Sequence, residues 1–271
     1  MNSDVDVSAD QRLAESLTAV IVKAAAAIRA ADYRSVASRL KADNSRVTDA
    51  DEAAEAVILG ELRTLAPDIP VVSEESAGAR PDGPTFFLVD PLDGTAEFLA
   101  GRDEYTVNIA LVRDGTPVVG LIAAPALGQV WRGVVGRSAE RLTFSGDCAA
   151  LREATPIQTR PRRTPQRVIA AVSRSHYDAA SAAFLRRFAP VDTLVCGSAL
   201  KFARIAEGAA DIYPRLAPTC EWDVAAGHAL VAAAGGIMTT PQGLALRYGG
   251  ADDFRVPGFI AWGDPQAAVP A

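Results

Sequence analysis

Two segments within the first 70 residues carry the signs of α-helices. Apolar residues recur at helical spacing over residues 8–31, where alanine-rich stretches also favour helix, and Ser8 or Asp10 is suited to cap the start. A second helix is predicted over residues 49–65, because acidic residues cluster in its first turn and Pro67 follows its end. The polar segment 41–51 lies between the two predicted helices.

Runs rich in Val, Ile and Phe then predict β-strands. These runs cover residues 70–75, 85–90, 106–115, 117–125 and 129–136. The Asp-Gly-Thr-Pro segment at residues 114–117 predicts a turn between two of them. This part of the chain therefore predicts a mainly antiparallel sheet.

A basic, proline-containing stretch at residues 155–167 separates this sheet from the rest of the chain. Strand and helix patterns alternate after it, which is typical of a layered α/β arrangement. We therefore expect an N-terminal α+β lobe over residues 1–160 and a C-terminal α/β lobe over residues 161–271.

The composition limits the expected partners. The chain has 271 residues, of which 49% are hydrophobic and 22% charged, enough for one large globular unit or two packed lobes. With 33 acidic against 27 basic residues the net charge is −6, so no overall positive field attracts nucleic acid or an anionic membrane surface. A polyanionic substrate therefore requires a local basic pocket or metal ions.

The cysteines and the N-terminal residues bear on the cellular compartment. Cys148, Cys196 and Cys220 are an odd number at wide spacing, which favours reduced thiols in a cytosolic protein. The first residues carry acids where a signal peptide carries basic residues, and Lys23 interrupts the apolar residues 17–28. We expect a cytoplasmic protein without an integral membrane segment; peripheral association with the inner face of the membrane and the oligomeric state stay open.

Two carboxylates on one tight turn are the strongest sign of chemistry. A buried strand is expected to end at Asp90, where a proline stops its ladder, and Asp93 follows on the same turn. Their oxygens and the main-chain carbonyl of Leu92 are the hard ligands that Mg²⁺ prefers. Gly94 and Thr95 then open a short helix whose free N–H groups can bind a phosphate. The alternative is an Asx-type turn with a helix cap.

Three further acidic segments have ordinary structural interpretations when each is considered alone. Glu74 and Glu75 follow another apolar strand and converge with Asp90 if the two strands pair, although adjacent glutamates are usually solvated. Asp223 lies at a predicted helix start, where aspartate is a common N-cap. Segment 41–51 alone would be a solvated loop that caps the next helix. Only their combination indicates a functional site.

In this order and at these separations, the segments resemble the signature of the inositol monophosphatase superfamily: Ser-Glu-Glu at 73–75, DPLDGT at 90–95 and WDVAAG at 222–227. Further segments resemble its bisphosphate nucleotidase branch, namely 41–51, 104–112, 173–176, 197–202 and 213–223. The resemblance runs from about residue 10 to about residue 260, and it implies the layered αβαβα fold of sugar phosphatases and inositol monophosphatases. The sequence departs from it at Arg46, Ala199 and Glu221, the last an extra acid beside the expected metal site.

The resemblance implies a centre of two or three Mg²⁺ ions. One ion would bind Glu74, Asp90 and the carbonyl of Leu92. A second would bind Asp90, Asp93 and Asp223, and a third, weaker ion would be held partly by Glu74.

The resemblance also implies the catalytic and substrate-binding residues. Asp51 and Thr95 match the residues that orient and deprotonate the attacking water, and Glu74 belongs to the same catalytic set. The substrate-binding set is Gly94, Thr95, His176, Ser198, Lys201 and Arg215. Each of the last four has an ordinary interpretation when considered alone, such as a turn residue or a surface lysine.

The implied activity is Mg²⁺-dependent hydrolysis of the 3'-phosphate of 3'-phosphoadenosine 5'-phosphate to AMP, in sulfur assimilation, with the 5'-phosphosulfate analogue as a further substrate candidate. The substrate partner is then a small bisphosphorylated nucleotide. One alternative is hydrolysis of inositol phosphates or fructose 1,6-bisphosphate, because those relatives share the metal motif. An alternative of another class is a non-catalytic regulator that binds a nucleotide or a protein. The retained acidic residues argue against the regulator.

Overall fold

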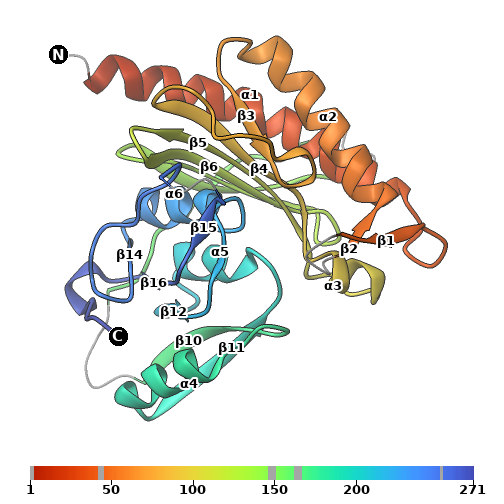
Figure 1. The fold of residues 1–271 in the computed structure, drawn as a ribbon. Coiled ribbons are helices and arrows are strands. Elements are labelled where there is room, and N and C mark those ends of the chain that lie inside the picture. The colour runs from red at the N-terminus through yellow and green to blue at the C-terminus, as the bar shows by residue number, and fades with distance from the viewer. Residues whose placement is uncertain (1–2, 42–45, 146–150, 162–166, 251–252) are drawn as a thin grey trace.

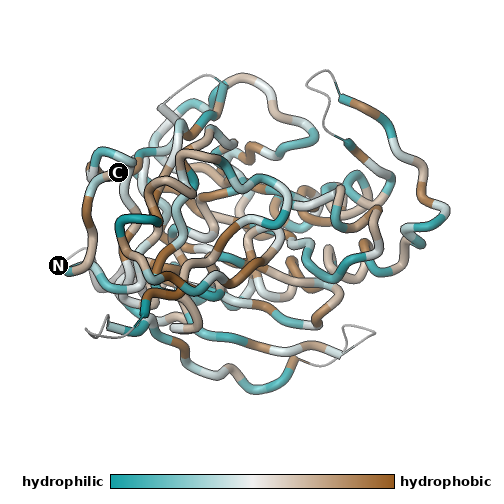
Figure 2. Tube along the Cα trace, turned by 90° about the horizontal axis from the view of Figure 1, so that it is seen from below, coloured by the Kyte–Doolittle hydropathy of each residue, from teal (hydrophilic) through white to brown (hydrophobic). Residues whose placement is uncertain are grey.

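Helices and sheets stack in five layers, in the order helix, sheet, helix, sheet, helix (Figure 1). The structure is a computed structural model that describes residues 3–41, 46–145, 151–161, 167–250 and 253–271. Apolar residues concentrate along the central strands and helices, and many outer loops are hydrophilic (Figure 2). The αβαβα fold expected from the resemblance is confirmed.

The first sheet has seven strands in the order β3-β4-β5-β6-β7-β8-β9. Neighbouring strands pair antiparallel except β3 and β4, which are parallel. Asp114 and Gly115, with φ angles of 50° and 70°, form the predicted turn between β5 and β6. The strands are β3 Val71–Ser73, β4 Thr85–Asp93, β5 Thr106–Arg113, β6 Thr116–Ala124, β7 Gln129–Val134, β8 Ser138–Thr143 and β9 Thr155–Pro156.

Two long helices cover one face of this sheet. Helix α1 (Ser3–Ala30) and helix α2 (Asp49–Leu65) bury residues such as Leu17 and Ile58 against Phe87 and Val107 in one apolar core. A short hairpin of β1 (Ser38–Leu40) and β2 (Arg46–Thr48) leads from α1 into α2. The hairpin thereby brings the start of α2 to the end of the sheet where β4 terminates (Figure 1).

Helix α6 (Ala225–Ala233) packs against the opposite face of the first sheet. Two glycines permit this close approach: a Cβ atom on Gly120 would lie 2.8 Å from Ala229 Cβ, and one on Gly133 would lie 2.8 Å from Leu230 Cα. Both distances are shorter than real Cβ contacts. The position of the residues just before α6 is therefore set by direct contact between helix and strand.

The second sheet has five strands in the order β11-β10-β12-β16-β14. Helices α5 (Leu200–Ala206) and α6 lie between the two sheets, and α4 (Ala179–Leu185) packs on the outer face. The strands are β10 Val168–Ser173, β11 Val191–Cys196, β12 Ile212–Arg215, β14 Ile237–Thr239 and β16 Phe259–Trp262. The short elements are α3 Thr95–Leu99, η1 Glu74–Ser76, η2 Arg186–Phe188, η3 Pro265–Ala267, β13 Thr219–Cys220 and β15 Arg255–Val256.

One apolar core joins the two sheets. It contains Val72 and Phe86 from the first sheet together with Tyr213 and Phe259 from the second. The strands of the first sheet come before residue 160 in the sequence, and those of the second sheet come after it. Both sheets nevertheless contribute side chains to this shared core. The division into lobes of 1–160 and 161–271 stays a prediction.

Two local predictions are wrong. Helix α1 begins at Ser3, so Ser8 and Asp10 do not cap it; Asp10 instead accepts hydrogen bonds from both terminal nitrogens of Arg113, at 3.0 and 2.8 Å. Pro91 does not end its strand either, because β4 continues to Asp93 with an irregular register between Asp90 and Asp93. The proline's missing N–H falls in this unpaired stretch, where no ladder bond is lost.

Candidate active site

A cleft of about 700 Å³ lies where the carboxyl ends of β3 and β4 meet the second sheet. Nearly all the site residues predicted from the sequence line it: Glu74, Asp90, Leu92, Asp93, Gly94, Thr95, His176, Ser198, Lys201, Arg215 and Asp223. Asp51 lies behind this surface and reaches it through Thr95. The fold thus brings the predicted residues together, although their individual roles stay predictions.

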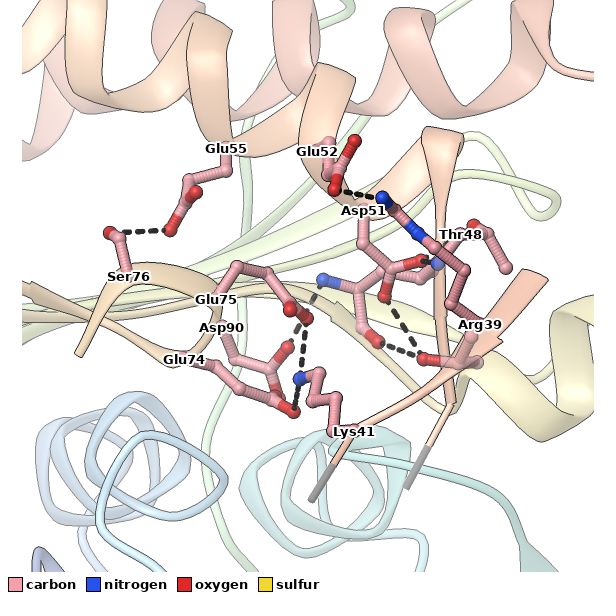
Figure 3. A network of polar contacts seen from close by, with 12 residues as sticks. Arg39, Lys41, Thr48, Asp51, Glu52, Glu55, Glu74, Glu75, Ser76 and Asp90 are labelled. Carbon is pink, nitrogen blue, oxygen red and sulfur yellow. Dashed lines mark hydrogen bonds and ion pairs between the residues drawn. The ribbon is translucent and has the colours of Figure 1, made fainter. Parts of the chain in front are cut away.

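Three carboxylates form a compact acidic group. Glu74, Asp90 and Asp223 each place one oxygen within 4.8 Å of the others. Ser73 pairs with Val89 in the parallel ladder of β3 and β4, so the next residue of each strand projects to the same place, as Figure 3 shows for Glu74 and Asp90. Asp223 reaches the group from the loop before α6. Only oxygen ligands are present, which suits a hard divalent cation such as Mg²⁺.

Burial and mutual repulsion raise the pKa values of Asp90, Glu74 and Asp93. Burial raises the pKa of Asp90 well above its ordinary value, and the charges of Glu74 and Asp93 raise it further. The pKa of Glu74 is raised to about 7, mainly by burial, although Lys41 opposes the shift. Burial and Asp223 raise the pKa of Asp93 to about 6. Such crowding of buried carboxylates fits a site whose charge is balanced by a bound cation.

The irregular end of β4 shapes the turn that carries Asp93. Leu92 donates its main-chain N–H to Asp90 Oδ1 at 3.0 Å. Its carbonyl oxygen lies 3.3 Å from Thr95 Oγ1, whose single proton goes to the nearer acceptor, Asp51 Oδ1, at 3.0 Å. Gly94 is in the left-handed region with φ of 92°, which ordinary side chains rarely adopt. Asp93 is not part of the acidic group of three, and its Oδ2 accepts a long hydrogen bond from Thr106 Oγ1 at 3.4 Å.

Asp51 serves the local structure and is also connected to the cleft through Thr95. Its Oδ2 accepts from the main-chain N–H of Thr48 at 2.8 Å and from Thr48 Oγ1 at 2.5 Å, which completes a capping box at the start of α2 (Figure 3). Its Oδ1 accepts from Thr95 Oγ1 at 3.0 Å. Burial raises the pKa of Asp51. The helix-capping interpretation and the functional one therefore both hold.

Lys41 contacts the acidic group directly. Its ammonium donates to Glu74 Oε1 at 2.7 Å and to Glu75 Oε1 at 2.8 Å (Figure 3). Burial lowers the pKa of Lys41, but the two glutamates outweigh that effect and raise it. Asp43, from the same segment, lies outside the described residues.

The acids before α6 do not have the surroundings that the sequence suggests. Asp223 does not cap α6, which begins at Ala225; its carboxylate accepts hydrogen bonds from Thr219 Oγ1 and from the main-chain N–H of Cys220, the latter at 3.2 Å. Glu221 is not part of the acidic group, although it is buried nearby. Both of its carboxylate oxygens accept from the main-chain N–H of Gly249, at 2.9 and 2.8 Å. The extra acid therefore holds a neighbouring loop.

The predicted nucleotide contacts differ in their freedom to bind. Lys201 is 3% exposed and donates to the main-chain oxygens of Ser198 and Cys196, at 2.5 and 3.5 Å. Burial lowers its pKa to about 8, and Asp93 opposes the shift. Arg215 makes a long bond to Pro218 O at 3.5 Å and also interacts with the hydroxyl of Tyr213, whereas its buried Nε has no hydrogen-bond partner among the described residues. His176 is exposed on the turn after β10.

Sequence reasoning missed several cleft residues. Tyr213 lies 5.2 Å from the ammonium of Lys201, measured to its ring centre. Trp222 and Arg255 also line the cleft, as does Arg46, one of the departures from the family pattern. Tyr213 and Trp222 lie inside segment 213–223, whose resemblance to the bisphosphate nucleotidase branch could have identified them as site residues. No sequence pattern singles out Arg255.

Comparison with known proteins agrees with this geometry. The family model described as "Inositol monophosphatase family" matches residues 7–263, so the chain belongs to the inositol monophosphatase family. Among curated proteins it is similar to the 3'(2'),5'-bisphosphate nucleotidase CysQ of Escherichia coli strain K12, with 43% identity over 222 residues, 81% of this chain and 86% of that protein. The nucleotidase of the same name from Haemophilus influenzae is 33% identical over 230 residues, 83% of each chain.

Solved structures agree with the family assignment. The crystal structure of CysQ from Bacteroides thetaiotaomicron superposes with a TM-score of 0.80 at 32% identity, over 93% of this chain and 97% of that one. An IMPase of Thermotoga maritima superposes with a TM-score of 0.74 over 94% of this chain and 93% of that one, and at 23% identity it supports the fold alone. Among the described helices, none combines the length and the hydrophobicity that crossing a bilayer requires.

Proposed function

We propose that this chain is a 3'(2'),5'-bisphosphate nucleotidase, which hydrolyses the 3'-phosphate of 3'-phosphoadenosine 5'-phosphate and yields AMP. One observation carries the proposal: a single cleft contains the acidic group around Asp90 and, beside it, the cationic side chains of Lys201 and Arg215. The acids suit a metal-dependent phosphatase, and the cations suit a substrate with a second phosphate. The name of the 43% identical protein of Escherichia coli supports this substrate class.

The acidic group fits Mg²⁺, and we propose two or three ions. Glu74, Asp90 and Asp223 would hold the metal, together with Asp93 and the carbonyl of Leu92. When bound, such ions polarise a phosphoryl oxygen and favour the ionisation of water. The acidic group of Glu74, Asp90 and Asp223 offers carboxylate oxygens as ligands, which favours Mg²⁺ over softer metals.

Asp51 and Thr95 would take the proton of the attacking water. Thr95 donates its hydroxyl proton to Asp51 Oδ1, so the oxygen of Thr95 retains lone pairs that can accept from water. The proton would pass from water to Thr95 as the proton of Thr95 passes to Asp51. Burial raises the pKa of Asp51 and makes it a better proton acceptor than an exposed aspartate.

The test compares phosphate release from 3'-phosphoadenosine 5'-phosphate, inositol 1-phosphate and fructose 1,6-bisphosphate at equal concentrations with Mg²⁺. We expect the highest kcat/KM for the nucleotide and no release in the presence of a chelator. A clear preference for inositol 1-phosphate would refute the proposed substrate. Full activity with chelator would refute the metal-dependent mechanism, and no turnover of any of the three would favour a regulator.

A further inference from the structure

Four residues connect the two sheets at the edge of the cleft, and we call this group the clamp: Glu104, Arg174, Gly197 and Ser198. Glu104 lies in the loop before β5, whereas Arg174 follows β10 and the other two follow β11. Arg174 donates from Nε to Glu104 Oε2 at 2.6 Å and from Nη2 to Oε1 at 2.8 Å. The main-chain N–H of Gly197 donates to the same Oε2 at 3.1 Å. One carboxylate therefore connects two segments of the second sheet to the first.

The clamp also contacts the turn that carries Asp93. Ser198 Oγ lies 2.8 Å from the carbonyl oxygen of Asp93 and 2.9 Å from that of Glu104. Its hydroxyl proton therefore connects the second sheet's side of the cleft to a main-chain oxygen on the first sheet's side. A Cβ atom on Gly94 would collide with Ser198 Oγ, and one on Gly197 would lie 2.6 Å from the carbonyl oxygen of Glu104. The backbones on the two sides are thus as close as glycine permits.

The same connection fixes the turn that presents His176. Arg174 donates its main-chain N–H to Cys196 O at 3.1 Å, and His176 donates its own to Ser173 Oγ at 3.0 Å. Ser175 donates its hydroxyl to Glu97, a buried residue of α3. The turn after β10 is therefore held by two carboxylates of the first sheet's side of the cleft.

We propose that Glu104 is a positioning residue for substrate selection: through the clamp it holds His176 and Ser198 at a set place relative to the turn of Asp93. This inference rests on the proposed nucleotidase function. The side chains of Glu104 and Arg174 are 25% and 38% exposed, so solvent screens part of the contribution of their ion pair to folding stability. Its paired hydrogen bonds fix orientation instead. Loss of the clamp should therefore appear in substrate selection more than in thermal stability.

The test variants are Glu104→Gln, Arg174→Ala and the double variant, assayed with 3'-phosphoadenosine 5'-phosphate and with 4-nitrophenyl phosphate, which lacks a nucleoside. Misplaced binding groups commonly cost one to two orders of magnitude, so Glu104→Gln should raise KM for the nucleotide roughly tenfold. The kcat of Glu104→Gln for the nucleotide, and its kcat/KM for 4-nitrophenyl phosphate, should stay within about twofold of the wild-type values. The double variant should resemble the single ones, because residues that act as a unit are not additive.

Asp211→Asn is the matched control. Asp211 accepts paired bonds from Arg160 at 2.7 and 2.8 Å and a main-chain N–H bond from Ile169 at 2.7 Å, but it does not line the cleft. Like Glu104, Asp211 therefore accepts a paired bond from an arginine and a bond from a main-chain N–H, but it does not contact residues of the site. We expect this variant to leave the ratio of kcat/KM for the two substrates unchanged.

Amide hydrogen exchange of residues 168–178 and 191–200 gives a readout that needs no substrate. Glu104→Gln should speed exchange in both segments, because it weakens the bond to Gly197 and the support of Arg174. An unchanged substrate ratio, unchanged exchange, a loss confined to Arg174→Ala, or a melting temperature lowered more than in the control would each overturn the proposal. If the wild-type protein does not hydrolyse the nucleotide, the proposed function is refuted. The hydrogen-exchange data alone then decide whether the clamp exists.

Discussion

Removal of the Arg215 side chain is the most direct test of how the cleft selects a substrate with two phosphates. The guanidinium lines the cleft at the end of β12, makes a long bond to Pro218 O at 3.5 Å and interacts with the hydroxyl of Tyr213. Its Nε is buried without a hydrogen-bond partner in the part of the chain that the structure describes. Buried donors without partners are costly, so this group is arranged to receive an anion. We therefore expect Arg215 to bind the phosphate that is not cleaved.

The size of the effect follows from charge-assisted hydrogen bonds. Such bonds contribute about 1.5–3 kcal/mol each, and about 1.4 kcal/mol corresponds to a factor of ten. Arg215→Ala should therefore raise KM for 3'-phosphoadenosine 5'-phosphate by roughly 10- to 150-fold with kcat little changed. The loss with 3'-AMP, which lacks the 5'-phosphate, should stay below about threefold. Steady-state phosphate release with both substrates measures the ratio.

Arg255→Ala is the control that distinguishes a specific contact of Arg215 with phosphate from a general effect of positive charge in the cleft. Arg255 also lines the cleft, but it is exposed to solvent, where its charge is screened. We expect this variant to change kcat/KM for both nucleotides by a similar, small factor. Equal losses with 3'-AMP and the bisphosphate in Arg215→Ala would refute the assignment and indicate that Arg215 supports the fold or the metal site.

Three further predictions concern the acidic side of the cleft. Asp90→Asn should abolish turnover and remove the stabilisation by Mg²⁺. It should also raise the melting temperature of the metal-free protein, by roughly 2–4 °C for each kcal/mol of repulsion relieved, because Asp90 is crowded by other acids. Calorimetry with and without Mg²⁺ tests both effects on stability. Because the folded-state pKa values of Glu74 and Asp93, about 7 and about 6, exceed their ordinary values, the folded state binds protons more tightly. Metal-free stability should therefore fall as the pH rises from about 4 to about 7, and saturating Mg²⁺ should remove that slope; a metal-free stability that rises over this range would contradict the shifts. Asp51→Asn should lower kcat by about 10²- to 10⁴-fold while Mg²⁺ still stabilises the protein, and a near-normal rate would show that other groups take the proton.

The parts of the fold that were predictable are those with a clear local period. The acidic first turn and the apolar stripe of residues 49–65 correspond to α2 without a shift, and the runs rich in Val, Ile and Phe correspond to β4 to β7. The strands that were not predicted are short or carry polar residues with little alternation, namely β1, β2, β8, β9, β13, β14 and β15. Their pairing comes from the neighbouring strand and not from their own sequence.

The site was less predictable than the elements, because its residues meet only through long-range packing. The register of β3 with β4 brings Glu74 beside Asp90, and no property of either segment states which strands pair. Asp223 joins them because α6 lies against Gly120 and Gly133, a contact that local sequence does not reveal. The motif resemblance supplied what local physics did not, namely which acids belong to one site.

Asp51 shows why a structural interpretation and a functional one need not compete. One oxygen of its carboxylate accepts the two bonds from Thr48 that begin α2, and the other accepts the bond from Thr95 in the cleft. The cap fixes the carboxylate, and the fixed carboxylate then orients the hydroxyl of Thr95. Because burial already raises the pKa of Asp51, the group is held in place and made a better proton acceptor by the same surroundings. A residue can therefore satisfy the ordinary criterion for a helix cap and, for that reason, be better placed for catalysis.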